Sequence, residues 1–516
     1  MRYPIGVQSF EKIIEGGYAY VDKTDLIYDL AQENVCFLCR PRRFGKSLLI
    51  STLEAYFKGR KELFEGLKIM AYEKDWTRYP VFRIDFAGAD FHNPEELAGK
   101  LDFLLRGWEK EYGVTDTGST LSDRMQIVLR EARVQTGHKA VVLIDEYDKP
   151  LLDVIGEDLE QKHRNILKGF YGTFKAADED LRFVLLTGVT KFSQISVFSG
   201  FNQPNDISMD AHYEAICGIT EEELYSVFAE SIRELARAMD YSEEEMKMEL
   251  KMQYDGYHFS KQLTDIYNPF SLINAFSVKD IDNYWYRSGT PTFLAKLING
   301  HNINMEKLLA RSYASQKFID YRADVSDPLA MLYQSGYLTI KAYDRVGRCY
   351  WLDYPNAEVR GGFTTLVAND YYGKDIEFGS WAQEINRIVY EGRVEDLEDA
   401  FVSFFADIDY QAHQKLKAAS YEEHFHYTFY LIMKLLSCYR PLIEKQNSRG
   451  RCDMVVETPK YVYIFEFILN GKADEALQQI ADKGYAEPYL SDPRQVYRIG
   501  VGFSQESNGI AEWKVE

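Results

Sequence analysis

The sequence has no apolar run of the roughly 18 residues that a membrane-spanning helix requires. Residues 1–14, MRYPIGVQSFEKII, have no apolar core of the kind that a secretory signal carries. Basic residues are in deficit, because 60 Lys and Arg stand against 80 Asp and Glu, and the net charge is −20. This charge argues against broad binding to nucleic acid or anionic membranes, although a local basic groove stays compatible with it. We expect a cytoplasmic protein with no membrane partner.

Cysteine is also scarce. The six cysteines are scattered, and only Cys36 and Cys39 form a C-x-x-C pair. This pair lies within the apolar run VCFLCR and has no second pair nearby, so we interpret it as part of a buried strand rather than a zinc or redox motif. The pattern is typical of a reduced intracellular protein.

The chain of 516 residues is too long for one hydrophobic core, and its hydrophobic fraction of 46% is that of a folded protein. In the first two-fifths, short apolar runs alternate with amphipathic stretches, which predicts an α/β fold with a mostly parallel sheet covered on both faces. We expect four domains: a core over 1–215, a helical lid over 216–315, a winged-helix-like and helical connector over 316–415, and a small α/β domain over 416–516.

A phosphate-binding loop is the strongest motif of the chain. In VCFLCRPRRFGKSLL, residues 35–49, an apolar strand leads into a glycine-containing loop and a helix, which together present backbone N–H groups to a phosphate. Lys46 is expected to reach the β- and γ-phosphates of ATP, and Ser47 to ligate Mg²⁺. Arg40 stands where the general pattern G-x-x-x-x-G-K-[ST] has its first glycine. The predicted nucleotide-binding residues of this loop are Arg40, Pro41, Arg42, Arg43, Phe44, Gly45, Lys46, Ser47 and Leu48.

A second apolar strand, in KAVVLIDEYDKP, ends in two acids. Asp145 is expected to hold Mg²⁺ through water, and Glu146 to polarise the water that attacks ATP. A third strand, LRFVLLTGVTKF, places Thr187, Thr190 and Lys191 where a γ-phosphate sensor would lie. Capping of the loop is the alternative role for these polar residues.

The segment DPLAMLYQSGYLTIKAYDRVGRCYWLDYPN predicts a helix and then a hairpin that turns at residues 345–347, which suggests a winged-helix shape. Lys341, Arg345 and Arg348 form a small basic set on this hairpin. A DNA-binding regulator is therefore a third, weaker hypothesis, and an ordinary surface wing is its alternative.

The C-terminal domain carries an acid on each of three predicted strands: Glu444 closes RPLIEK, Asp453 opens the strand in GRCDMVVET, and Glu466 ends YVYIFEF. Carboxylates that converge in this way can bind Mg²⁺ and direct a metal-bound water at a phosphodiester. The 13-residue step from Asp453 to Glu466 fits a hairpin that returns the second acid beside the first. Solvated strand ends are the alternative reading.

The sequence blocks YAYVDKT, RPRRFGKSLL, IDEYDKPL, TGVTKFSQISVFSGFN, YDGYHFS, YNPFSL and GYLTI occur in this order over nearly the whole chain. With them the chain resembles the bacterial AAA-ATPase-like family that carries a C-terminal PD-(D/E)XK nuclease superfamily domain. The resemblance implies a P-loop ATPase core, a helical lid and a nuclease-type domain. It also implies that Arg40 is the family's own form of the loop. For YDGYHFS and YNPFSL we expect a packed turn between core and lid.

The nuclease pattern requires E-x-K, and here it reads Glu466-Phe467-Ile468. Isoleucine can neither orient a water molecule nor offset negative charge. Lys472, in the loop after the strand, and Lys483, on the next helix, are candidate substitutes, because this superfamily sometimes relocates its lysine to that helix. A solvated surface charge is the alternative role for each. We therefore expect a metal-binding domain whose cleavage is impaired or altered.

The leading hypothesis is an ATP-hydrolysing protein whose nucleotide state controls the nuclease-like domain, with ATP and Mg²⁺ as cofactors and DNA or RNA as the partner of that domain. The alternative is a nucleotide-dependent switch or scaffold whose C-terminal domain only recognises its partner. Arg42 and Arg43 are candidate arginine fingers. A protein partner or a homo-oligomer is compatible with either hypothesis.

Overall fold

The computed structural model describes residues 1–115, 118–191, 204–288, 305–319, 328–372, 378–407, 442–446, 451–504 and 509–516. The chain divides into two compact units. The first comprises Met1–Ile303 and Arg311–Asn356, and the second comprises Asn304–Ala310 and Ala357–Glu516. Within the described ranges, no helix is long and apolar enough to cross a membrane.

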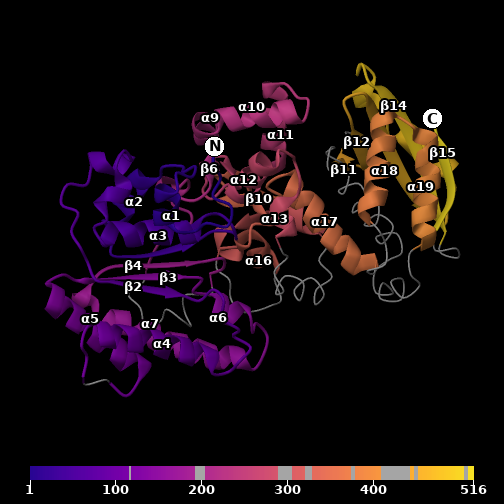
Figure 1. Cartoon of the computed structure of the whole chain (residues 1–516). Coiled ribbons are helices and arrows are strands. Elements are labelled where there is room, and N and C mark those ends of the chain that lie inside the picture. The colour runs from indigo at the N-terminus through magenta and orange to yellow at the C-terminus, as the bar shows by residue number, and fades with distance from the viewer. Residues whose placement is uncertain are drawn as a thin grey trace. The chain divides into compact units, whose positions relative to one another are not determined.

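The first unit contains a five-stranded sheet in which every paired neighbour is parallel, in the order β2-β3-β4-β1-β5. The strands are β1 (Val35–Cys39), β2 (Val81–Asp85), β3 (Ala140–Asp145), β4 (Leu181–Gly188) and β5 (Asn205–Asp206). One face carries α1 (Phe10–Glu15), α2 (Thr24–Leu30) and α3 (Lys46–Phe57) (Figure 1). The other face carries α4 (Glu96–Glu111), α5 (Leu121–Thr136), α6 (Lys149–Leu152) and α7 (Leu159–Ala176).

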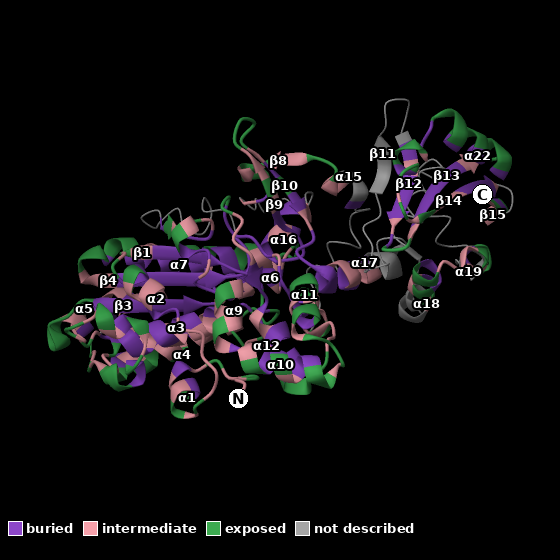
Figure 2. Ribbon diagram, turned by 90° about the horizontal axis from the view of Figure 1, so that it is seen from above, coloured by how far each residue is buried: buried purple, intermediate pink, exposed green. Residues whose placement is uncertain are grey.

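Burial explains why β1, β3 and β4 are largely apolar. All six residues of β3 are buried, and Figure 2 shows buried strands between helices, whereas β2 alternates buried and half-buried residues. A strand covered on both faces has no solvent side on which polar residues would be favoured. The predicted parallel α/β sheet is confirmed.

A group of helices, termed the lid, follows the sheet in the sequence of the first unit. It consists of α9 (Glu221–Val227), α10 (Ala229–Ala238), α11 (Glu243–Tyr254), α12 (Pro269–Val278) and α13 (Tyr284–Arg287), with a short ladder of β6 (Ile219–Thr220) and β7 (Ile266–Tyr267). Capping boxes start α9, at Thr220 and Glu223, and α11, at Ser242 and Glu245. The helices bury a common core that includes Leu224, Leu235, Leu250 and Leu272.

A three-stranded sheet in the order β8-β10-β9 completes the first unit. Its elements are β8 (Ser312–Ala314), α16 (Pro328–Gln334), β9 (Thr339–Asp344) and β10 (Cys349–Asp353). The predicted helix and hairpin are therefore present. Lys341, however, does not belong to an exposed basic set, because its Nζ donates to the carbonyl oxygens of Gly256 at 2.9 Å and Pro355 at 2.8 Å.

The second unit is a mixed sheet flanked by helices. Its sheet order is β11-β12-β13-β14-β15, and β13–β14 is the parallel pair. The strands are β11 (Leu442–Gln446), β12 (Arg451–Glu457), β13 (Tyr461–Leu469), β14 (Gln495–Ser504) and β15 (Gly509–Val515). The helices are α15 (Met305–Leu309), α17 (Ala357–Tyr372), α18 (Phe378–Glu391), α19 (Val394–Asp407) and α22 (Ala473–Asp482). The sequence also predicts a helix over residues 421–439, and these residues lie outside the described ranges.

Three tyrosine hydroxyls hold the carboxyl end of α18 against this sheet. Tyr463 donates to the carbonyl of Val389 at 2.8 Å, and Tyr461 donates to that of Glu391 at 3.3 Å. Tyr497 donates to the carbonyl of Gly392 at 3.4 Å. The last carbonyls of a helix have no donor within the helix, so these hydroxyls supply the missing hydrogen-bond donors.

The lid buries an acid without a hydrogen-bond partner among the described residues. Asp255 is 2% exposed, and neither of its carboxylate oxygens accepts a hydrogen bond. The nearest cation is Lys251, whose Nζ lies 3.9 Å from Asp255 Oδ2. Burial, and secondarily the charge of Asp265, raises the pKa of Asp255 to about 7.

The substitution Asp255→Asn should stabilise the protein at neutral and alkaline pH. The carboxylate is destabilised in the fold, so its cost is absent below about pH 4 and grows as the pH rises towards 7. Three pKa units correspond to roughly 4 kcal/mol, which is an upper limit for the gain above pH 7. Thermal denaturation of both proteins between pH 5 and 8.5 measures this difference. A difference in Tm that did not grow with pH would contradict the assignment.

Candidate functional site

The carboxyl ends of three strands meet at one edge of the parallel sheet. Cys39, the last residue of β1, pairs with Gly188 of β4, and Leu38 pairs with Thr187. On the other side of β4, Leu186 pairs with Ile144, the residue before Asp145. This register places the predicted phosphate loop, the acid pair and Thr187 together, although about 100 residues separate the loop from the acids.

Two residues of the loop have left-handed backbone. Gly45 has a φ of +96°, which glycine adopts without steric cost, and Arg43 has a φ of +67°. The helix α3 starts at Lys46, so its first N–H groups open towards the loop. The Lys46 ammonium folds back over the loop and donates to the carbonyl oxygens of Arg40 and Pro41, each at 2.9 Å.

Lys46 is 7% exposed, and its environment combines desolvation with negative charge. Burial lowers the pKa of Lys46, and the charges of Asp145, Asp148 and Glu146 act in the opposite direction. The lysine of the loop and the acids after β3 therefore share one electrostatic environment, as the sequence predicts.

The acid pair has unusual local geometry. Asp145 is buried and accepts from Thr187 Oγ1 at 2.7 Å and from the backbone N–H of Glu146 at 3.1 Å. Glu146 has a φ of +52°, a strained conformation for a residue with a Cβ, and its side chain is half-buried. Burial raises the pKa of Glu146, with Lys46 acting against this. A carboxylate in such a position is suited to accept a proton from water.

Sequence reasoning overlooked the third acid, Asp148. Its buried carboxylate accepts from the backbone N–H groups of Val189 at 2.9 Å and Thr190 at 2.7 Å, and from Thr190 Oγ1 at 2.9 Å. A Cβ on Gly188 would lie 2.6 Å from Asp148 Oδ1, so the close contact requires glycine. Asp148 fixes the turn that follows β4. The signal for it was the third acid in DEYDKP.

The three proposed sensor residues have different partners, and Thr190 donates to Asp148. Thr187 binds Asp145, while the ammonium of Lys191 forms an ion pair with Asp206 of β5. The backbone N–H of Lys191 donates to Gln334 Oε1 at 2.7 Å. Thr187 thus lies beside the acid pair, whereas Lys191 would have to leave Asp206 to reach a phosphate.

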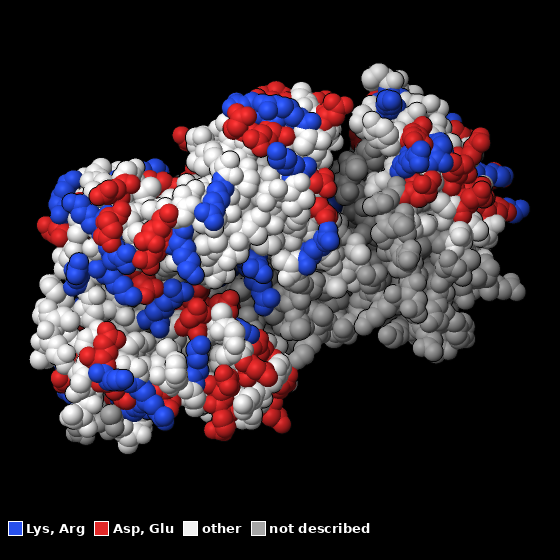
Figure 3. All heavy atoms as spheres, in the orientation of Figure 1, with Lys and Arg blue, Asp and Glu red and all other residues white. Residues whose placement is uncertain are grey.

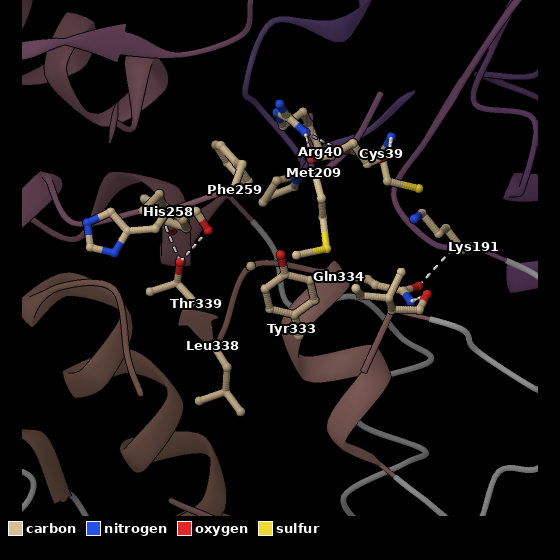
Figure 4. Close-up of a pocket in the computed structure, with 15 residues that line it drawn as sticks. Cys39, Arg40, Lys191, Met209, His258, Phe259, Tyr333, Gln334, Leu338 and Thr339 are labelled. Atoms are coloured by element: carbon tan, nitrogen blue, oxygen red, sulfur yellow. Dashed lines mark hydrogen bonds between the residues drawn. The ribbon is translucent and has the colours of Figure 1, made fainter. Parts of the chain in front are cut away.

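Two further side chains of the loop, Arg40 and Phe44, pack against aromatic rings of the segment 257–259. Arg40 is buried, and its guanidinium lies 4.1 Å from the ring centroid of Phe259 (Figure 4). Phe44 makes edge contacts with Tyr257 and Phe259. Arg42 and Arg43 are exposed, so both stay candidates for contact with a phosphate.

An apolar cavity of about 100 Å³ lies beside Gly45 and Leu48. Its walls come from the N-terminal segment, α3 and the lid, and include Ala19, Val21, Ile216, Phe228, Pro269 and Ile273. Lys23, also in the wall, pairs with Glu223 of α9 at 2.5 Å. Sequence reasoning could not find this cavity because its lining is spread over more than 250 residues.

A second pair of acids lies in the C-terminal sheet. The antiparallel pairing of Met454 with Phe465 aligns Asp453 with Glu466, as the hairpin spacing predicts. Glu466 Oε2 accepts from the backbone N–H of Asp453 at 3.2 Å, and Asp453 Oδ2 accepts from that of Phe467 at 2.9 Å. Burial, and secondarily the charge of Asp453, raises the pKa of Glu466 to about 8. Two adjoining carboxylates with this electrostatic cost fit a bound cation.

The strand positions of these acids differ from those expected. Glu466 lies within β13, which continues to Leu469, and is 1% exposed rather than at a strand end. Asp453 is the third residue of β12, and Glu444 is in the middle of β11. The pairs Ile443–Met454 and Lys445–Cys452 place the Glu444 backbone level with Asp453, while the Glu444 side chain lies outside what the structure describes.

Helix α22 supplies a contact that the sequence did not predict. The side-chain amide of Gln479 donates to Glu466 Oε1. Lys472 and Lys483 are exposed at the two ends of α22, as its N-cap and C-cap residues. Within the described ranges, no group of three His, Cys, Asp or Glu side chains could hold a metal ion. The pair Asp453–Glu466 would therefore form part of a ligand set.

Comparisons with known proteins agree with both predicted domains. The model of a family described as "Predicted AAA-ATPase" matches residues 4–198, and that of a "PD-(D/E)XK nuclease superfamily" matches residues 420–513. A protein of Azotobacter chroococcum mcd 1, named "Uncharacterized protein in vnfD 5'region", is 35% identical over 527 residues. The alignment covers 100% of this chain and 99% of that protein.

Proposed function

The chain belongs to the family that joins an AAA-ATPase-like domain to a PD-(D/E)XK nuclease superfamily domain, and we propose that it hydrolyses ATP and uses its nucleotide state to control the nuclease-like domain. One observation carries the first half of this proposal. Lys46 rests on two carbonyls of a phosphate-type loop and shares the electrostatic environment of Asp145 and Glu146, at the edge where β1, β3 and β4 end.

Each residue of the nucleotide site has a separate task in this proposal. Lys46 exchanges its two carbonyl partners for phosphate oxygens, which replaces neutral acceptors by charged ones. Ser47 and Asp145 would hold Mg²⁺, with Thr187 fixing the Asp145 carboxylate. A bound Mg²⁺ would neutralise charge that develops on the phosphate oxygens. Glu146 accepts the proton of the attacking water.

The cavity beside Gly45 and Leu48 is suited to the base of the nucleotide. It is apolar, it adjoins the loop that would bind the phosphates, and its walls include residues from both core and lid. A flat aromatic base buries apolar surface there. Binding at this place would therefore connect the lid to the occupancy of the phosphate loop.

The C-terminal domain is proposed to bind a divalent cation through Asp453 and Glu466 and to act on nucleic acid. The cation would polarise a water molecule directed at a phosphodiester. Ile468 supplies no charge to assist this step, and Gln479 offers an amide hydrogen bond in place of an ammonium. Cleavage is therefore expected to be slow unless Lys483 or Lys472 moves towards the acids.

The same observations support a second candidate, a nucleotide-dependent switch whose C-terminal domain recognises but does not cleave its partner. Glu466 is nearly inaccessible, and its neighbour at the lysine position is apolar. On the face shown in Figure 3, acidic and basic side chains are interspersed over the described surface, so binding would depend on local contacts rather than on overall charge. A cytoplasmic location and a homo-oligomer stay predictions.

Two substitutions test the nucleotide site. Lys46→Ala should abolish ATP turnover because the phosphates lose their counter-charge, and Glu146→Gln should lower kcat by about 10²- to 10⁴-fold while leaving ATP binding intact. Steady-state phosphate release and fluorescent-nucleotide titration measure the two effects. The control is Lys58→Ala, which removes an exposed lysine just beyond the other end of α3. Unchanged turnover in Lys46→Ala would refute the site.

The nuclease-like domain is tested by cleavage of DNA and RNA with Mg²⁺ or Mn²⁺, with and without ATP. We expect weak cleavage that Asp453→Ala removes and Ile468→Lys raises. Leu469→Lys is a matched control, because it adds the same charge at the neighbouring position on the opposite face of β13. Robust wild-type cleavage that Asp453→Ala abolishes would contradict impairment. Nucleic-acid binding without cleavage in any variant would favour the recognition role.

A further inference from the structure

The segment Tyr254–Ser260, with the sequence YDGYHFS, connects the end of α11 to the turn before β7. We call it the coupling segment. None of the residues of the proposed ATPase mechanism belongs to this segment. It touches both the phosphate loop and the residues at which the chain leaves the first unit.

At one end the coupling segment packs against the phosphate loop. Phe259 lies under the Arg40 guanidinium, and Tyr257 lies 4.7 Å from Phe44 between ring centroids. Pro41 packs against Gly336, where a Cβ would lie 2.6 Å from Pro41 Cβ. The loop is thus enclosed by residues that are more than 200 positions away in the sequence.

Arg40 is a buried cation that no carboxylate neutralises within ion-pair distance in the described part of the chain. Its guanidinium instead donates to four carbonyl oxygens, those of Cys39 at 2.9 Å, Ser208 at 2.8 Å, Tyr213 at 3.1 Å and Glu214 at 3.4 Å. Burying a charge is costly unless hydrogen bonds compensate for it, so these contacts hold Arg40 in one place. The backbone carbonyl of Arg40 is also one of the two hydrogen-bond acceptors of the Lys46 ammonium.

The other end of the coupling segment lies against Pro355 and Asn356, at the end of the first unit. The backbone carbonyl of Asp255 accepts from Asn356 Nδ2 at 2.8 Å, and Lys341 bridges the carbonyls of Gly256 and Pro355. Gly256 has a φ of +85°, and a Cβ there would lie 2.4 Å from the Pro355 oxygen. Asn356 is the last residue of the first unit.

His258 fastens the middle of the coupling segment to β9. Its backbone N–H donates to Thr339 Oγ1 at 2.8 Å. Its ring nitrogens face two acceptors, Nδ1 the carbonyl of Ile340 at 2.6 Å and Nε2 the carboxylate of Asp265 at 2.7 Å. Both nitrogens can donate at once only when the ring carries two protons. The segment is therefore tied to β9 at Thr339 and Ile340, and to the chain before β7 at Asp265.

We propose that Arg40 and Phe259 are positioning residues of the nucleotide site, and that the coupling segment passes the state of the phosphate loop to Pro355 and Asn356. This proposal rests on ATP binding at the loop. When Lys46 leaves the carbonyls of Arg40 and Pro41 for a phosphate, the loop loses two hydrogen bonds that hold it closed. Its displacement acts on Phe259 and Tyr257 through packed contacts. Packed interiors transmit such shifts rather than absorb them.

The positioning role is tested with Phe259→Leu and Arg40→Lys, which keep apolar volume and charge respectively but remove the ring face and the planar fork of donors. Both should lower kcat for ATP by about tenfold or more, because small misplacements of a catalytic group are costly, while the affinity for a fluorescent ATP analogue changes less than about threefold. Phe64→Leu is the control, since Phe64 is equally buried but packs away from the segment. Unchanged kcat in both variants would overturn the role.

The coupling role is tested on the full chain by hydrogen exchange with and without the ATP analogue. Binding should change the exchange of amides over residues 339–356, and Asn356→Ala and Lys341→Met should reduce this change while binding the analogue as wild type does. Thermal denaturation identifies any variant that fails to fold, and the other variant then decides. An unchanged exchange in wild type, or a full response in a folded variant, would overturn coupling. If wild type binds no analogue, the proposed ATP site itself fails, which the titration shows separately.

Discussion

The buried guanidinium of Arg40 is the constraint on which the proposed nucleotide site depends. It stands where a phosphate loop ordinarily has a small flexible residue, and it converts the start of the loop into a fixed point. Four carbonyls from the strand end and the segment 208–214 are satisfied by one side chain. The Lys46 ammonium in turn donates hydrogen bonds to the carbonyl oxygens of Arg40 and Pro41. Arg40, which is held by neutral carbonyl acceptors, thus fixes the position of the Lys46 ammonium.

The sequence predicted those features that depend on burial and local chemistry. Strands such as β3 are recognisable because both faces are covered, and α11 is recognisable because Ser242 and Glu245 cap it. The alignment of Asp453 with Glu466 followed from hairpin spacing alone. These features depend on neighbours along the chain or on a repeating pattern.

Features that depend on distant contacts were not predictable. Lys341 appeared to be a surface charge, yet it bridges carbonyls of Gly256 and Pro355. Gln479 gave no signal in the sequence, because its contact with Glu466 arises only when α22 packs on β13. The strand β15 was missed since GIAEWKV alternates weakly and carries two charges. In each case the contact depends on tertiary packing or strand pairing that the local residue pattern does not specify.

The adjoining acids of β12 and β13 have a thermodynamic meaning that is separate from catalysis. Glu466 and Asp453 lie side by side in a poorly solvated position, so ionising both is costly, and the pKa of Glu466 is raised to about 8. Glu466 therefore keeps its proton at neutral pH. A divalent cation bound by both carboxylates would displace that proton, and by linkage the native state would gain stability with rising cation concentration. The domain would act as a metal-stabilised structure even when it cuts no bond.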